Sequence, residues 1–149
     1  MKKVVSVVML IVIIFCTGCA ARKEAITESE FISIVEQAGY TTLEVTSGYE
    51  DSQLVKKSIA AVKDGIQIEL IIATSNSAGE NIYNQTKTRD EQNGASTNTS
   101  SSIGKKSDYS ITTSSTYYFC SRIGDTVVYA NEPKENKEAV QQIVEELGY

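Results

Sequence analysis

Few residues in the chain could do covalent chemistry, because it has three cysteines and no histidine. A serine or cysteine nucleophile is commonly activated by a neighbouring histidine, so this composition argues against that type of active site. Cys120 stands alone in a run of strand-forming residues, where a thiol is most often a small buried apolar group. Cys16 and Cys19 instead lie close together at the end of an apolar N-terminal segment. We therefore link their chemistry to that segment.

The N-terminal segment has the organisation of an export signal. Met1-Lys2-Lys3 is positively charged, and residues 4–16 are apolar apart from Ser6. This run is shorter than the about 20 residues that a helix needs to cross the hydrocarbon core of a bilayer. It fits the apolar region of a signal peptide, and small residues follow it up to Cys19.

The junction Thr17-Gly18-Cys19 resembles the lipobox of bacterial lipoproteins. In that family the signal peptidase cuts before the cysteine, whose thiol carries a diacylglycerol. The resemblance implies a signal peptide over residues 1–18, lipid attachment at Cys19 and a place on the extracytoplasmic face of the cell membrane. Cys16 stands where the family usually has Leu, a departure that would slow processing. An ordinary secretory signal cut slightly later, or an uncleaved anchor, is the alternative.

Composition limits the partners and cofactors of the exported part. The chain carries a formal net charge of −5. This charge argues against nucleic acid as a partner and against binding to anionic lipid through a cluster of basic residues. Removing the signal peptide and acylating Cys19 would leave Cys120 without a disulfide partner. We expect no metal, since histidine is absent and the acidic pairs lack the spacing of a calcium loop. No cofactor other than the covalent lipid is expected.

Two hydrophobic periodicities alternate after a predicted tether over residues 19–26. The helical period begins at a capping box, Thr27–Glu30, and recurs at the C-terminal end of the chain. Between these helices the period is two, which indicates half-buried strands. A middle helix is predicted from a capping box, Ser77–Glu80, and a thin apolar stripe that includes Ile82 and Tyr83. The dipeptide Asp64-Gly65 is typical of a two-residue hairpin turn, and it sets a register with Ile59 opposite Leu70.

Residues 27–149 are therefore predicted to form a single α+β domain, an antiparallel sheet with helices on one face in the order α-βββ-α-βββ-α. The outer helices both end in a glycine and a tyrosine, Gly39-Tyr40 and Gly148-Tyr149. Internal duplication and independent use of the same helix ending explain this repetition equally well. Residues 90–107 are rich in Ser, Thr and Asn, and we predict a flexible loop there.

A binding face is predicted on the side of the sheet that the helices would leave open. Tyr118, Arg122 and Tyr129 share that side, and tyrosine and arginine are enriched where proteins bind partners. The alternative is that these side chains only stabilise a half-exposed sheet. We expect a non-catalytic binding or interaction module of the cell envelope, with another envelope protein, a peptide or a glycan as partner. The alternative function is an envelope hydrolase with a carboxylate-only active site, which needs two carboxylates in a cleft.

Overall fold

The structure of the protein is a computed structural model that describes residues 24–49 and 53–149. Cys19 and the predicted signal peptide lie outside these residues. The described part contains α-helices, short 3-10 helices (η) and β-strands. Their bounds are α1 (Glu28–Gln37), β1 (Thr41–Glu44), η1 (Thr46–Tyr49), β2 (Val55–Lys63), β3 (Ile66–Ala73), α2 (Asn76–Glu91), β4 (Thr97–Ile103), β5 (Lys106–Thr112), β6 (Thr116–Ile123), β7 (Thr126–Pro133), η2 (Lys134–Asn136) and α3 (Lys137–Glu146).

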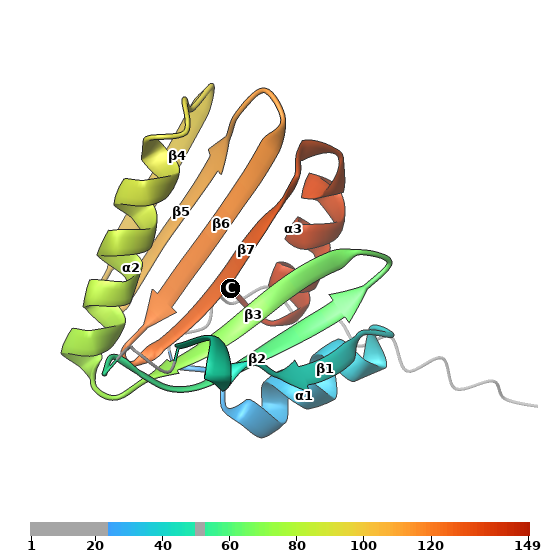
Figure 1. The fold of residues 1–149 in the computed structure, drawn as a ribbon, viewed down its shortest axis with the longest axis vertical. Helices are drawn as coiled ribbons and strands as arrows, with labels where there is room; N and C mark the ends of the chain where they lie inside the picture. The colour runs from blue at the N-terminus through green and yellow to red at the C-terminus, as the bar shows by residue number, and fades with distance from the viewer. Residues whose placement is uncertain (1–23, 50–52) are drawn as a thin grey trace, which may run out of the picture.

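The strands of the described part form one seven-stranded sheet in the order β1-β2-β3-β7-β6-β5-β4 (Figure 1). Every neighbouring pair is antiparallel. Two meanders, β1 to β3 and β4 to β7, join where β3 pairs with β7 at the centre of the sheet. The predicted α+β class and the antiparallel sheet are confirmed. The second meander has one strand more than predicted, which is β4.

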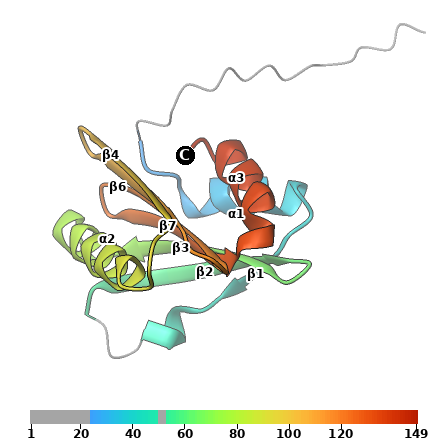
Figure 2. The same ribbon diagram turned by 90° about the horizontal axis from the view of Figure 1, so that it is seen from above.

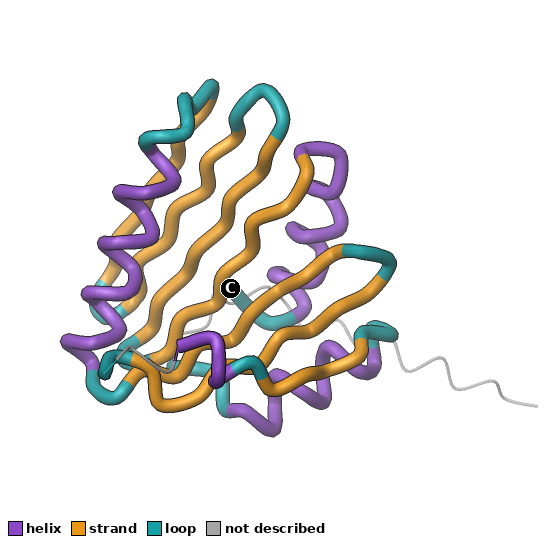
Figure 3. Tube along the Cα trace, in the orientation of Figure 1, coloured by secondary structure: helices purple, strands orange, loops and turns teal. Residues whose placement is uncertain are grey.

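The segment 90–107, predicted as a flexible loop, is largely regular structure (Figure 3). The helix α2 extends to Glu91, β4 covers Thr97–Ile103, and β5 begins at Lys106. The strand β4 pairs with β5 along its whole length, and all seven of its residues are exposed. An edge strand that buries neither face needs no alternation of apolar and polar residues, so its sequence pattern could not reveal it. The loop prediction was wrong for these residues.

Tight turns fix the register of the central hairpins. Asp64 and Gly65 have φ values of 51° and 82°, as a two-residue turn with positive φ at both positions requires. The predicted pairing of Ile59 with Leu70 is confirmed. Gly124, with φ of 64°, lies in the turn between β6 and β7.

One face of the sheet is covered by α1 and α3 (Figure 2). The Thr27 side chain accepts from the Glu30 backbone N–H while the Glu30 carboxylate accepts from the Thr27 N–H, so the predicted capping box is confirmed. Phe31 of α1 packs in the same buried cluster as Leu70 of β3. Ile26, at the end of the predicted tether, is buried there too, so the folded part begins before the capping box.

The opposite face is covered by α2, so the prediction that all helices lie on one face was wrong (Figure 2). Ile71 follows Leu70 in β3 and points the other way, into a second cluster with Ala78 and Ile82 of α2. Gly79 allows this approach, because a Cβ there would lie 2.8 Å from the carbonyl oxygen of Gly124. The thin apolar stripe of α2 gives no sign of which face it covers.

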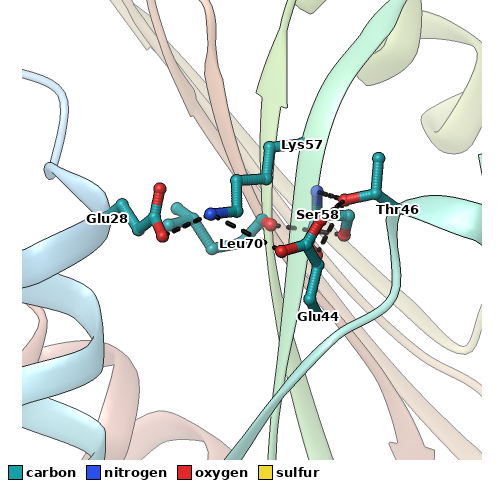
Figure 4. Close-up of polar contacts among 6 residues, drawn as sticks. All are labelled: Glu28, Glu44, Thr46, Lys57, Ser58 and Leu70. Atoms are coloured by element: carbon teal, nitrogen blue, oxygen red, sulfur yellow. Dashed lines mark hydrogen bonds and ion pairs between the residues drawn. The ribbon is translucent and has the colours of Figure 1, made fainter.

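Adjacent residues of β2 connect the sheet to both layers (Figure 4). Lys57 donates to Glu28 of α1 at 2.6 Å and lies 3.6 Å from Glu44 of β1. The Ser58 side chain points to the other face. Its backbone N–H donates to the Thr46 hydroxyl of η1 at 2.9 Å. The segment η1 therefore lies on the same side of the sheet as α2 (Figure 2).

No helix within residues 24–49 and 53–149 combines the length and the apolar character that crossing a bilayer would require.

Candidate binding cleft

The predicted binding face of Tyr118, Arg122 and Tyr129 is covered by α2. Tyr118 is buried in the cluster that α2 forms with the sheet. The Arg122 side chain donates to the carbonyl oxygen of Gly124 at 3.1 Å, so it supports the β6–β7 turn. The exposed aromatic patch is therefore absent from these three residues. The prediction failed because the sheet face that was expected to be open is largely apolar and packs against α2.

Tyr129 is the member of this set that reaches a cleft. The cleft opens between α2 and the segment that contains η1 and the start of β2, and its volume is about 700 Å³. Strands β3 and β7 supply its floor. We call it the α2–η1 cleft, and it is lined by Tyr49, Leu54, Val55, Glu69, Ile71, Ile82, Gln85, Thr86, Arg89, Tyr129 and Asn131.

Glu69 is the carboxylate of this cleft, and its two oxygens have different surroundings. The Tyr49 hydroxyl donates to Oε1 at 2.8 Å, and the Ser58 hydroxyl donates to the same oxygen. No hydrogen bond from the described residues reaches Oε2. Burial, followed by the hydrogen bond to Glu69, raises the pKa of Tyr49 above its usual value, which keeps this hydroxyl a donor. Among the described residues, Glu69 is thus held through one oxygen, and the other has no protein partner.

Arg89 lies on the wall of the cleft that α2 forms, on the last turn of this helix. Its Nη2 donates to the Tyr129 hydroxyl at 2.7 Å, and its Nε donates to Asp90 at 3.1 Å. The guanidinium carbon also lies 5.4 Å from the centre of the Tyr129 ring. The Arg89 side chain is still 60% exposed, so these contacts fix its position without hiding it. A guanidinium held in this way can donate to carboxylate, carbonyl or hydroxyl oxygens of a ligand.

Asp90 lies beneath the cleft and is fully buried. It accepts from the Tyr109 hydroxyl at 2.8 Å, and the Tyr129 hydroxyl lies 3.4 Å from it. Burial is the first cause that raises the pKa of both Tyr109 and Tyr129, followed by Cys120 for Tyr109 and by Asp90 for Tyr129. The carboxylate therefore orients Arg89 and Tyr129 from below without contacting the ligand space.

The described lining of this cleft contains polar binding groups and no cysteine or serine. Cys120 is fully buried, and burial raises the pKa of its thiol well above the usual value. Glu69 is the one carboxylate in the described lining, so the pair that the hydrolase alternative needs is not found there. Residues 24–49 and 53–149 also contain no cluster of three or more metal-binding side chains.

Sequence reasoning found part of this site. Tyr129 was among the predicted binding residues, and a carboxylate at Glu69 within the largely apolar run Ile66–Ala73 is a usable signal. Asp90 was placed at the start of the predicted loop 90–107, and Arg89 was assigned no role. Nothing in the sequence indicates that these two residues meet Tyr129, which lies 39 or 40 positions further along the chain.

Comparison with known proteins gives a fold relationship. No family model matches the chain, and no curated protein matches it. One solved structure, described as a GTP binding regulator (TM1622) from Thermotoga maritima, superposes with a TM-score of 0.51. The two chains are 13% identical, and the match covers 79% of this chain and 84% of that chain. At this identity the likeness shows a shared fold alone.

Proposed function

We propose that the protein is a membrane-anchored extracytoplasmic lipoprotein whose domain is a non-catalytic binding module. Its lipid is attached at Cys19, and its partner is an envelope protein, a peptide or a glycan that enters the α2–η1 cleft. The sequence of residues 1–19 supports the anchor, and the cleft supports the binding role.

The observation that carries the binding role is the Glu69 carboxylate in the floor of the cleft, whose Oε2 accepts no hydrogen bond from the described residues. Among the described residues, the buried side-chain polar atom without a partner is Nε of Arg122, so Oε2 of Glu69 is open to solvent or to a ligand. Gln85 and Asn131 add amide groups to the same lining, and Arg89 adds a fixed cation. This mixture of donors and acceptors beside two tyrosine rings suits a polar ligand with hydroxyl or amide groups.

The anchor is tested by metabolic labelling with a fatty-acid analogue. The full chain should incorporate the label, and Cys19→Ala should lose it because the acceptor thiol is gone. Cys120→Ala is the matched control and should label like the unchanged chain, since that thiol is buried. Equal labelling of the Cys19→Ala chain would refute the anchor.

The cleft is tested by capturing partners from solubilised membranes with the full chain and with Glu69→Gln. The amide oxygen can still accept from Tyr49 and Ser58, so the fold should be kept while the negative charge is lost. Glu80→Gln removes an equal charge from an exposed site on α2 and is the control. The proposal expects a partner that Glu80→Gln retains and Glu69→Gln loses. A partner retained equally by both variants would place the binding site elsewhere.

A further inference from the structure

The strand β4 forms an edge of the sheet that has none of the usual protection. Its sequence, Thr97–Ile103, contains no charged residue and no proline, and its pairing with β5 runs without a bulge. All of its residues are exposed, including Ile103, whose side chain is among the large apolar groups on the surface. No strand of the described part pairs with the outer edge of β4, and α2 meets β4 through a hydrogen bond from Asn98 to Glu91.

The edge at the other end of the sheet is built differently. The strand β1 has four residues, carries Glu44 and runs directly into η1. A short, charged edge strand is a common protection against pairing with another chain. An edge strand without charge, proline or bulge leaves its unpaired N–H and C=O groups available for pairing with another chain. The two edges of this sheet therefore differ in the property that decides whether a further strand can add.

The backbone groups that β4 offers follow from its hairpin with β5. Ile103 and Lys106 flank a two-residue turn, so their pair exchanges backbone hydrogen bonds and every second pair along the ladder does the same. Asn98, Ser100 and Ser102 then direct their N–H and C=O groups away from β5. These outward groups have a spacing that an added antiparallel strand can match.

We propose that β4 is a homodimer interface, on which β4 of a second copy pairs antiparallel about a two-fold axis at Ser100. This axis sets Ser100 opposite its own copy and Asn98 opposite the partner's Ser102. A two-fold axis perpendicular to the sheet does not exchange its two faces. Side chains that lie opposite each other in the paired β4 strands therefore point to the same face of the joined sheet. The two sheets become one continuous sheet of both chains.

Charge favours a second copy as the occupant. The chain is acidic overall, so most surfaces repel their own copy, but β4 contributes no charge to that repulsion. Lys105 follows β4 at one end, and Glu91 lies beside Asn98 at the other. The two-fold axis brings Lys105 of each copy toward the Glu91 end of its partner. No residue of β4 lines the α2–η1 cleft, so pairing leaves that cleft open, and the inference is independent of the proposed ligand.

The register gives a cysteine cross-linking test in membranes that contain the full chain. Opposed Ser100 residues would have Cα atoms about 5.5 Å apart, within reach of a short bifunctional thiosulfonate. Two Asn98 residues would be roughly 14 Å apart, because each is displaced by four positions from the other. We expect Ser100→Cys to give a dimer band at least about tenfold stronger than Asn98→Cys, since the reagent spans only the first distance.

Mixed chains provide the second measurement. Asn98→Cys expressed together with Ser102→Cys should give a strong cross-link, although neither variant does so alone. The unchanged chain supplies the background from its own cysteines. Absence of a Ser100→Cys dimer would overturn the proposal. Equal cross-linking by Asn98→Cys, or a Ser100→Cys adduct with a different protein, would overturn it as well.

Discussion

At the scale of single residues, Asp90 holds the side chains of the cleft wall in position through hydrogen bonds. It is fully buried at the end of α2, and its oxygens receive the Tyr109 hydroxyl and the Arg89 Nε. A buried ion is costly unless its partners are in place, so removing one member affects the others. Asp90 and Tyr109 should therefore be energetically coupled.

We predict that Asp90→Ala lowers the free energy of unfolding by about 2–3 kcal/mol, because the buried Tyr109 hydroxyl loses its acceptor. Adding Tyr109→Phe should recover part of that loss, since the orphaned hydroxyl is then gone. Urea unfolding of the single and double variants measures the coupling. Glu80→Ala is the exposed control and should change stability little. Strictly additive losses would show that the two residues do not depend on each other.

At the scale of elements, the position of α2 depends on a backbone contact between Gly79 and the β6–β7 turn. A Cβ at Gly79 would lie 2.8 Å from the Gly124 carbonyl oxygen, which a backbone turn cannot easily avoid. The cleft wall is part of this helix, because Arg89 lies three turns further along it. The packing of α2 and the geometry of the cleft are therefore connected.

We predict that Gly79→Ala destabilises the fold by about 1–3 kcal/mol through this overlap, although alanine would favour an isolated helix. The sign of the change tests the packing, because a loosely packed helix would gain stability from the same substitution. Gly48→Ala is the control, as no atom lies within 4 Å of its Cβ position. Thermal unfolding of both variants, followed by circular dichroism, provides the measurement.

The parts of the fold that sequence predicted are those with local signals. The capping box at Thr27 and the turn at Asp64-Gly65 depend on residues within a few positions of each other. The pairing of β4 and the side of the sheet that α2 covers depend on distant partners. Arg89 and Tyr129 meet for the same reason, through the packing of α2, so sequence placed Tyr129 on an open face and left Arg89 unassigned.

At the scale of the whole molecule, tyrosines lie in both cores and in the cleft. The chain has eight, and Tyr83 of α2 packs edge to face on Tyr109 of β5, with the ring centroids 5.4 Å apart. Burial, followed by nearby acidic groups, raises the pKa of Tyr83 to about 12. The pKa values of Tyr49, Tyr109 and Tyr129 are also raised, with burial as the first cause. The native state therefore holds these protons at a pH where the unfolded chain has lost them.

We predict that stability falls as pH rises above about 10, the usual tyrosine pKa. Between that value and the native pKa, the folded state binds more protons than the unfolded state, so the free energy of unfolding decreases with pH. For Tyr83 the loss should extend through a pH of about 12. Urea unfolding at a series of pH values measures the slope, and Tyr83→Phe should reduce it. A stability that stays constant through this window would contradict the raised pKa values.

The last residue of the chain lies beside the start of the folded domain. The Tyr149 hydroxyl accepts from the Ile26 backbone N–H at 3.2 Å, so one side chain spans the distance between them. A short peptide could thus join residue 149 to residue 25, and new ends could be opened at the Gly104-Lys105 turn. Such a circular permutant would keep every strand pair of the sheet while its free ends lie between β4 and β5.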